Sequence, residues 1–353
     1  MNPIHLAGRG LACSLGLSVE QALATLQQGR AHATQVSLPG AMAGDYPFHA
    51  IPFSQPDWNE RACTLVQRVV AEAGAQHIRN GVLLIATSSF DIGAVERGAT
   101  RMDYQAFADK VAAWLDWCGP VHVVNTACTS SLNALLFAQA LLRSGAATDA
   151  LVLGIELYNR LTLGGFAALQ LLSRTGSRPF GAERDGLVLG EAVAALHLSV
   201  REASGWQLLG GASVVDGEQP TGASPVAVCE MYRQALADSG VVTEAIDLVK
   251  VQAAGSPGND AVEAQGLRST FDSMPPLVSL KATMGHTMGA SGAAEIALLT
   301  ACLEQGAWPG GENAADQELG VTLAAAMPSD VRRFMATILG FGGSHASVVL
   351  ERT

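Results

Sequence analysis

The segment of residues 121–136 most constrains the fold of this chain, because it passes from strand-forming to helix-forming sequence within a few positions. Its first residues, Val-His-Val-Val, are mostly β-branched, whereas its last residues, Leu-Asn-Ala-Leu-Leu, favour a helix. Cys128 falls at the junction, where the unpaired N–H groups of a helix start favour a thiolate over a thiol. We therefore expect Cys128 to be a nucleophile; the alternative is a buried structural cysteine.

The same alternation of short apolar segments and amphipathic segments runs through the rest of the chain. It predicts an early helix at residues 18–28, with Ser18 as its N-cap, and a helix at 131–144. An alanine- and glycine-rich helix is expected to be central and buried at residues 290–304. The predicted strands are residues 4–11, 81–87, 122–125, 150–155, 247–253, 277–279, 334–339 and 346–350. This order predicts an α/β protein with right-handed crossovers and a largely parallel sheet.

Composition narrows the class of protein. The 353 residues are enough for one large or two closely packed domains, and 49% hydrophobic against 15% charged residues is typical of a folded chain. A net charge of −11 argues against nucleic acid as a partner. No apolar run approaches a membrane span, and the first residues lack a signal-peptide pattern. Six scattered cysteines without a C-x-x-C pair predict a reduced, cytoplasmic protein with no metal site.

Three further positions are candidates for chemistry. His286 lies in a glycine-flanked turn, where an imidazole can accept the thiol proton or hydrogen-bond a developing oxyanion; the alternative is a core histidine. Lys281 lies in an apolar setting and needs a partner, either a histidine or an acid such as Glu295. Gly342 and Gly343 offer backbone N–H groups for an oxyanion.

Taken together, these segments resemble the β-ketoacyl-acyl-carrier-protein synthase family of the thiolase superfamily. The resemblance covers nearly the whole chain in order, through residues 8–16, 125–131, 178–191, 281–286 and 341–343. It implies a thiolase-like α/β fold, in which two similar halves form a layered α-β-α-β-α core. The halves are expected at residues 1–205, with Cys128, and 206–353, with Lys281 and His286.

The resemblance also implies a division of labour among the site residues. Cys128 accepts an acyl chain as a thioester, His286 supports decarboxylation of a malonyl extender, and Lys281 orients the network. The oxyanion hole and acyl pocket are formed by the N–H of Cys128 itself and by Phe341, Gly342, Gly343 and Phe166. No cofactor is implied.

The chain departs from the family at a second histidine. The family has Ala-His-Gly-Thr where this chain has Ala-Ala-Gly-Ser at residues 253–256, so Ala254 replaces the histidine. Loss of such a group commonly costs on the order of 100- to 1000-fold in rate. His345, where the family usually has asparagine, is a candidate substitute. The stretch between Ser88 and Val121 is also shorter than is usual in the family.

These departures leave two functions open. One is a chain-length-factor-type partner, as in the aryl-polyene and other type II polyketide systems, which forms a heterodimer with an active synthase. The other is an independent acyltransferase or synthase, forming a homodimer and a thioester on Cys128; a thiolase acting on coenzyme A esters is more remote. Acyl carrier protein is an expected partner, docked on a basic patch for which Arg61, Arg68 and Arg79 are candidates.

Overall fold

The structure is a computed structural model that describes residues 2–29, 33–217, 221–310 and 314–353. The first part of the chain forms β1 (His5–Cys13), α1 (Val19–Gln27), β2 (Thr34–Leu38), η1 (Gly40–Met42), β3 (Gly44–His49), α2 (Trp58–Glu72), η2 (Ala75–His77), β4 (Val82–Ala86), α3 (Ile92–Val95), α4 (Tyr104–Trp114), β5 (Val121–Val124), α5 (Ser130–Arg143), β6 (Asp149–Glu156), α6 (Arg160–Ala168), β7 (Leu189–Gly190) and β8 (Ala192–Ser199).

The second part forms β9 (Trp206–Val215), α7 (Pro225–Ser239), η3 (Thr243–Ala245), β10 (Leu248–Lys250), α8 (Pro257–Thr270), β11 (Leu277–Val278), α9 (Lys281–Met284), η4 (Met288–Ala290), α10 (Ser291–Gln305), η5 (Gln317–Leu319), β12 (Arg333–Leu339), η6 (Phe341–Gly343) and β13 (Ser344–Arg352). Every predicted strand and helix has a counterpart, although the strand expected at 247–253 is shorter. Ser18 caps α1 as predicted, because its hydroxyl accepts the N–H of Gln21 at 3.2 Å.

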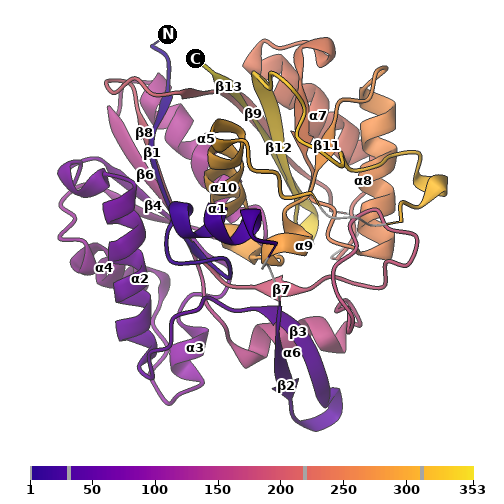
Figure 1. Cartoon of the computed structure of the whole chain (residues 1–353). Coiled ribbons are helices and arrows are strands. Elements are labelled where there is room, and N and C mark those ends of the chain that lie inside the picture. The colour runs from indigo at the N-terminus through magenta and orange to yellow at the C-terminus, as the bar shows by residue number, and fades with distance from the viewer. Residues whose placement is uncertain (1, 30–32, 218–220, 311–313) are drawn as a thin grey trace.

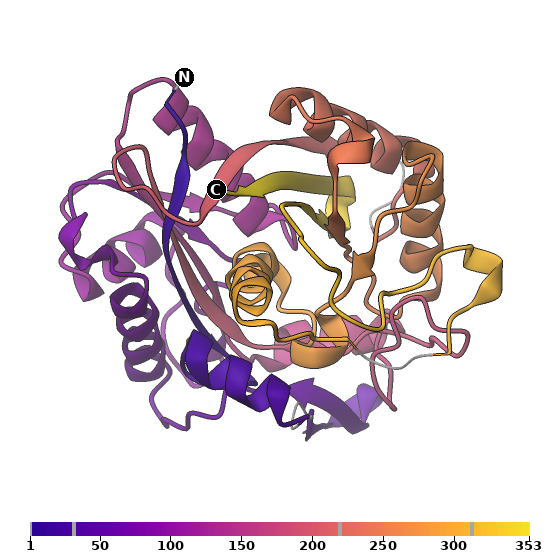
Figure 2. The same cartoon turned by 45° about the horizontal axis from the view of Figure 1, so that its top comes forward.

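The helices and strands are stacked in layers (Figures 1 and 2). One sheet has the strand order β11-β10-β12-β13-β9-β1-β8-β6-β4-β5, and its two halves meet where β1 pairs with β9. The helices α2 and α4 pack outside the first half, and α7 and α8 lie outside the second. The helices α5 and α10 lie between the halves and contact strands of both. This is the layered α-β-α-β-α core expected from the sequence.

The prediction of a largely parallel sheet is wrong. Within this ten-stranded sheet, the described strands pair in parallel only at β4 with β5 and β6, and at β10 with β11 and β12. The centre of the sheet is antiparallel, from β6 through β8, β1, β9 and β13 to β12. The closing strands β12 and β13 show the reason: only a few residues join them, which is too short for a crossover connection.

The predicted central helix is α10, and its residues from Ser291 to Leu303 are all buried. Small residues at its start allow close packing against α5. A Cβ at Gly292 would lie 2.6 Å from the side chain of Leu132, so a larger residue there would force that side chain to shift. Among the described residues, no helix is both long and apolar enough to cross a membrane.

Candidate active site

Cys128 lies in the short turn between β5 and α5, as the sequence predicts. The residue before it, Ala127, has a φ of 51°, in the left-handed region that non-glycine residues rarely adopt. Hydrogen bonds hold this turn: the Ser130 hydroxyl donates to the Ala127 carbonyl at 2.6 Å, and the Thr129 hydroxyl donates to the Thr126 carbonyl at 2.7 Å. The surrounding structure therefore fixes the direction of the Cys128 side chain.

The thiol faces His286. The Nε2 atom of His286 lies 3.0 Å from the Sγ atom of Cys128, and both residues are buried. The backbone of His286 is fixed by the strand β7, since its N–H donates to the Val188 carbonyl at 2.7 Å and its carbonyl accepts the Gly190 N–H at 3.0 Å. The fold therefore brings together Cys128 and His286, which are 158 residues apart in the sequence.

Lys281 sets the proton arrangement of this imidazole. Its Nζ lies 3.1 Å from the Nδ1 atom of His286. An ammonium group can only donate, so Nδ1 accepts and the ring proton resides on Nε2, facing the sulfur. Burial and the Lys281 charge lower the pKa of His286 well below its usual value, so the ring is neutral. His286 is therefore arranged as a hydrogen-bond donor toward Cys128 and not as a base for its proton.

Burial is the largest influence on the pKa of the Cys128 thiol. It raises the pKa of Cys128 to about 11, although the Lys281 charge and the backbone N–H groups of Phe341 and Cys128 lower it in part. The expected net preference for thiolate at the helix start is therefore wrong for the free side chain, because desolvation of the anion outweighs the helix. The two N–H groups that face the sulfur occupy the place expected of an oxyanion hole.

The loop Phe341–Gly343 closes over the thiol from the other half of the chain. The Phe341 ring stacks on Phe166 of α6, with centroids 5.2 Å apart, so these two predicted residues are in contact. Gly342 and Gly343 both have positive φ, 75° and 73°. A Cβ at Gly343 would lie 1.5 Å from the Asp216 carbonyl oxygen, so only glycine fits there.

Behind Lys281 is a buried charge cluster that sequence reasoning identified only in part. Lys281 contacts one carboxylate oxygen of Glu295, as expected. Lys250, which the sequence analysis missed, contacts the other oxygen and donates to the Thr337 carbonyl at 2.7 Å. Burial alone would raise the pKa of Glu295, but the two lysine charges outweigh it and leave the pKa lowered. A single lysine at the end of an apolar strand, such as Lys250, forms no recognisable sequence motif. The only sequence signal that could have identified it is that lysines are rare in this chain.

Ala254 shares an apolar cluster with residues that adjoin His286. It belongs to the apolar cluster that includes Leu189 and Met288, and Leu189 forms a β-bridge with His286. The loop around Ala254 is firmly held, because Asp260 accepts the N–H groups of residues 254, 255 and 256 at 3.0–3.2 Å. The backbone of this loop is therefore firmly held, with an alanine at position 254.

His345 does not take its place. Side chains alternate across a strand, and Ser344 of β13 bonds Thr129 at 2.8 Å, on the side of the thiol. His345 points to the opposite face, which it shares with its cross-strand partner Leu339 and with Val349. Burial lowers the pKa of His345, and neither ring nitrogen has a hydrogen-bond partner among the described residues. The structure therefore corrects the suggestion that His345 substitutes for the missing histidine.

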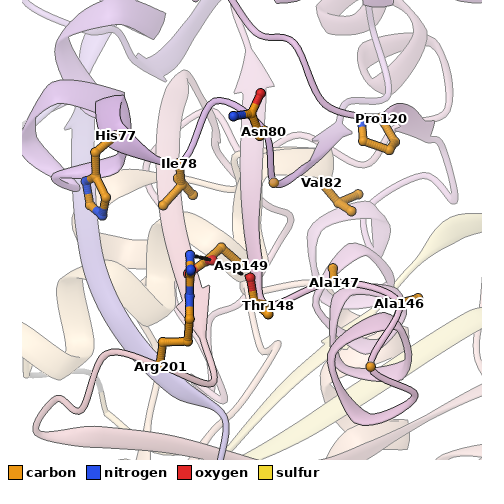
Figure 3. Close-up of a pocket in the computed structure, with 12 residues that line it drawn as sticks. His77, Ile78, Asn80, Val82, Pro120, Ala146, Ala147, Thr148, Asp149 and Arg201 are labelled. Carbon is orange, nitrogen blue, oxygen red and sulfur yellow. Dashed lines mark hydrogen bonds and ion pairs between the residues drawn. The ribbon is translucent and has the colours of Figure 1, made fainter.

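A separate cavity of about 540 Å³ lies at the opposite edge of the sheet, where β4 and β6 begin (Figure 3). In the described chain, Asp149, His197 and Glu202 form a group with metal-ligand spacing. The Asp149 carboxylate accepts hydrogen bonds from Ser199 and Thr148 at 2.7 and 2.8 Å and contacts Arg201, so both of its oxygens already have partners. Neither feature involves the Cys128–His286 pair.

Arg61 is not part of a basic docking patch. Its guanidinium donates two hydrogen bonds to Glu191, at 2.6 and 2.8 Å, and another to the Phe53 carbonyl. Arg68 is exposed, and Arg79 lies 3.6 Å from Asp116. Of the three arginines expected in the patch, Arg61 and Arg79 thus have carboxylate partners, whereas Arg68 donates to the Leu17 carbonyl.

Comparison of the sequence with known protein families identifies the family to which this fold and site belong. Residues 69–203 match the family description "Beta-ketoacyl synthase, N-terminal domain", and residues 207–314 match "Beta-ketoacyl synthase, C-terminal domain". The chain belongs to the β-ketoacyl synthase family. The Cys128 turn falls in the first match, and Lys281 and His286 fall in the second.

Curated members of the β-ketoacyl synthase family are distant in sequence. A non-reducing polyketide synthase, sor2, of Hypocrea jecorina is 30% identical over 69% of this chain, but the match covers 10% of that protein. The 3-oxoacyl-[acyl-carrier-protein] synthase 2 of Coxiella burnetii is 28% identical over 67% of this chain and 63% of its own length. The chain thus matches less than two thirds of the length of either relative.

A solved β-ketoacyl synthase structure shows the same fold over the whole chain. It is the ketosynthase ApeO in complex with its chain length factor ApeC, from Xenorhabdus doucetiae. A chain of this complex superimposes with a TM-score of 0.85 at 22% identity, covering 100% of this chain and 98% of that one. At this identity the likeness is one of fold.

Proposed function

We propose that this chain is a chain-length-factor-type partner of an active β-ketoacyl-acyl-carrier-protein synthase, in polyketide or fatty-acid assembly of the aryl-polyene kind. The observation that carries the proposal is Ala254. Decarboxylation of a malonyl unit creates a carbanion that needs hydrogen-bond donors, and a methyl group donates none. His286 is then the remaining imidazole beside the thiol, so the chain alone extends poorly and its partner supplies the condensation.

An exposed sheet edge supports a partner role. The strand β5 ends the ten-stranded sheet and, among the described strands, pairs with β4 alone; it carries the partly exposed side chains of Val121, Val123 and Val124. Beside it, the ring of Phe137 is 39% exposed and packs on His122, with centroids 5.3 Å apart. An unpaired edge next to exposed aromatic surface is a template for another chain. This edge leads directly into the Cys128 turn, so a partner bound there adjoins the site.

The solved ApeO–ApeC complex supports the same proposal by analogy of fold. In that pair, a ketosynthase and its chain length factor form one complex. A chain with this fold, an exposed sheet edge and an incomplete acid–base set is suited to the factor's place. Acyl carrier protein is then a partner of the pair, and the acyl chain on it is the shared substrate.

A second candidate function is acyl transfer by this chain itself, because Cys128, His286 and the two N–H groups at the sulfur are all in place. In this step Sγ attacks the carrier thioester carbonyl, and the N–H groups of Phe341 and Cys128 stabilise the oxyanion. The carrier carbon–sulfur bond then breaks, and the thiol proton of Cys128 leaves with the carrier sulfur. The products are an acyl-Cys128 thioester and a free carrier thiol.

Co-expression with a complete synthase, followed by sizing and assay of each protein alone and of the pair, tests the proposal. We expect a heterodimer that extends malonyl units and a lone chain that does not. A homodimer of this chain that condenses malonyl units at a normal rate would overturn the partner role. The Cys128→Ala variant separates the two functions: unchanged product from the pair removes acyl transfer, whereas lost product supports it.

A further inference from the structure

We propose that Lys250 is a positioning residue for the Cys128–His286 pair and acts on it through Glu295. The sequence holds only three lysines, Lys110, Lys250 and Lys281, among 21 cationic residues. Two of these three are fully buried and share one carboxylate. Nearly all the other cationic residues are arginines. Two buried lysines that contact the same glutamate therefore make this cluster unusual within the chain.

The contacts form one continuous line from Lys250 to the thiol. Lys250 at the end of β10 holds Oε2 of Glu295, and Glu295 holds Lys281 through its other oxygen, Oε1. Lys281 reaches Nδ1 of His286 at 3.1 Å, and Nε2 of His286 reaches the sulfur at 3.0 Å. Ser291 of α10 completes the arrangement, with its hydroxyl 3.1 Å from Lys281 and 3.2 Å from Nδ1.

Lys250 affects both the geometry and the charge of this line. It fixes the Glu295 carboxylate against the Thr337 carbonyl of β12, so Oε1 is held in a defined place for Lys281. Two ammonium groups on one carboxylate also leave the cluster with one net positive charge. Burial and both lysine charges lower the pKa of His286. Without Lys250, the Lys281–Glu295 pair is neutral, and Glu295 competes more strongly with His286 for the Lys281 ammonium.

A structural role alone does not account for a charge at this position. Leu248, which shares the face of β10 with Lys250, lies in an apolar cluster, and burial lowers the pKa of Lys250 itself. An apolar side chain at position 250 would pack without that desolvation cost. The charge of Lys250 is explained if it keeps the His286 imidazole neutral, with its proton on Nε2.

The test compares thiol chemistry in Lys250→Met, Lys250→Arg and Lys110→Met. Lys110 lies on α4 and bonds Asn59, so its variant removes a lysine charge elsewhere. We expect alkylation of Cys128 at pH 8, followed by mass spectrometry, to slow about tenfold in Lys250→Met, since one pKa unit is a factor of ten. Lys250→Arg keeps the charge, so its rate is expected to lie closer to the native rate than that of Lys250→Met. Lys110→Met is expected to leave it unchanged.

A second measurement on the unaltered chain keeps the proposal testable if Lys250→Met does not fold. Nitrogen-15 NMR of histidine is expected to show His286 as the Nε2–H tautomer from pH 5 to 9. A folded Lys250→Met variant with native alkylation rate, or an Nδ1–H tautomer in the unaltered chain, would overturn the proposal. The functional meaning of this inference rests on acylation of Cys128 in the proposed function. Both measurements use the chain alone, so failure to find a partner synthase leaves them intact.

Discussion

The backbone N–H of Ala254 donates a hydrogen bond to Oδ1 of Asp260 at 3.1 Å, although residue 254 has no side chain able to do chemistry. The same carboxyl accepts the N–H of Phe180 at 2.9 Å, and Ser279 accepts the N–H of Lys281 while donating to the Ala253 carbonyl. The loop is thereby tied to the Lys281–His286 segment. The backbone of the loop is therefore held in place by contacts that do not depend on the side chain at position 254.

We therefore expect Ala254→His to gain activity. A histidine there adds the missing donor, and malonyl decarboxylation by the lone chain is expected to rise about 100-fold or more. Release of labelled carbon dioxide from malonyl-carrier protein measures it. Ala254→Asn, similar in size but with a poorer proton donor, is the control. Equal rates in the two variants would contradict the role assigned to an imidazole at this position.

The thiol of Cys128 is expected to react slowly at neutral pH. Burial raises its pKa to about 11, so the thiolate fraction and the alkylation rate should rise about tenfold per pH unit between pH 7 and 10. Mass spectrometry after brief iodoacetamide treatment measures each cysteine, and exposed Cys118 is the internal standard. Lys281→Met removes a charge that lowers this pKa and should slow the reaction further. A Cys128 rate that is independent of pH from 7 to 10 would contradict this account.

Two adjacent glycines provide a matched pair for the closing loop. Gly342 and Gly343 share nearly the same φ, but a Cβ meets nothing within 4 Å at Gly342 and the Asp216 carbonyl at 1.5 Å at Gly343. Gly342→Ala is expected to cost about 1 kcal/mol of unfolding free energy, from backbone strain alone. Gly343→Ala should cost about 3 kcal/mol or more and displace the Phe341 N–H from the sulfur. Urea unfolding of both variants measures the difference, and similar costs would argue against the close contact.

Stability should fall in acid through His49. Burial lowers the pKa of this side chain from 6.5 to about 4. Between these two pH values, His49 is therefore protonated in the unfolded chain but not in the folded chain. The stabilisation is fully present above pH 6.5 and is lost as the pH falls toward 4, by on the order of 3 kcal/mol. His49→Phe lacks this titration. We expect the unfolding free energies of the native chain and the variant to diverge over this range; parallel curves would contradict the assignment.

The exposed edge at β5 should determine association. Phe137→Asp places a charge on the proposed partner face and is expected to weaken binding of a partner synthase at least tenfold, by sizing or calorimetry. Val242→Asp is the control, because Val242 is 64% exposed but lies by η3, in the other half of the chain. Equal weakening by both variants would point to general destabilisation and not to this face.

The site was predictable where its residues are close in sequence, and not where they meet through the fold. Cys128 was identified at a strand–helix junction, and Lys281 and His286 lie five residues apart, so local sequence was enough. Lys250 was missed because its partner Glu295 is 45 residues away and only packing brings them together. The face occupied by His345 depends on the register of β13, which a sequence does not display.

The antiparallel centre of the sheet was missed for a similar reason. Helices and strands follow local patterns, whereas the direction in which two strands pair depends on residues far apart in the chain. The strand β1 pairs with β8 across nearly the whole first half, for example His5 with Ser199. Alternation of strands and helices alone therefore predicts parallel crossovers and misses such long-range pairing.

That pairing of β1 with β8 and β9 has a consequence for how the chain folds. The strand β1 has no partner until Ser199 and Gln207 have been synthesised, so its apolar residues stay uncovered while about two hundred further residues are made. Such high contact order makes folding slow. It also makes closure of the sheet at β1 a late step, and the nascent chain a natural client for chaperones until that strand is covered.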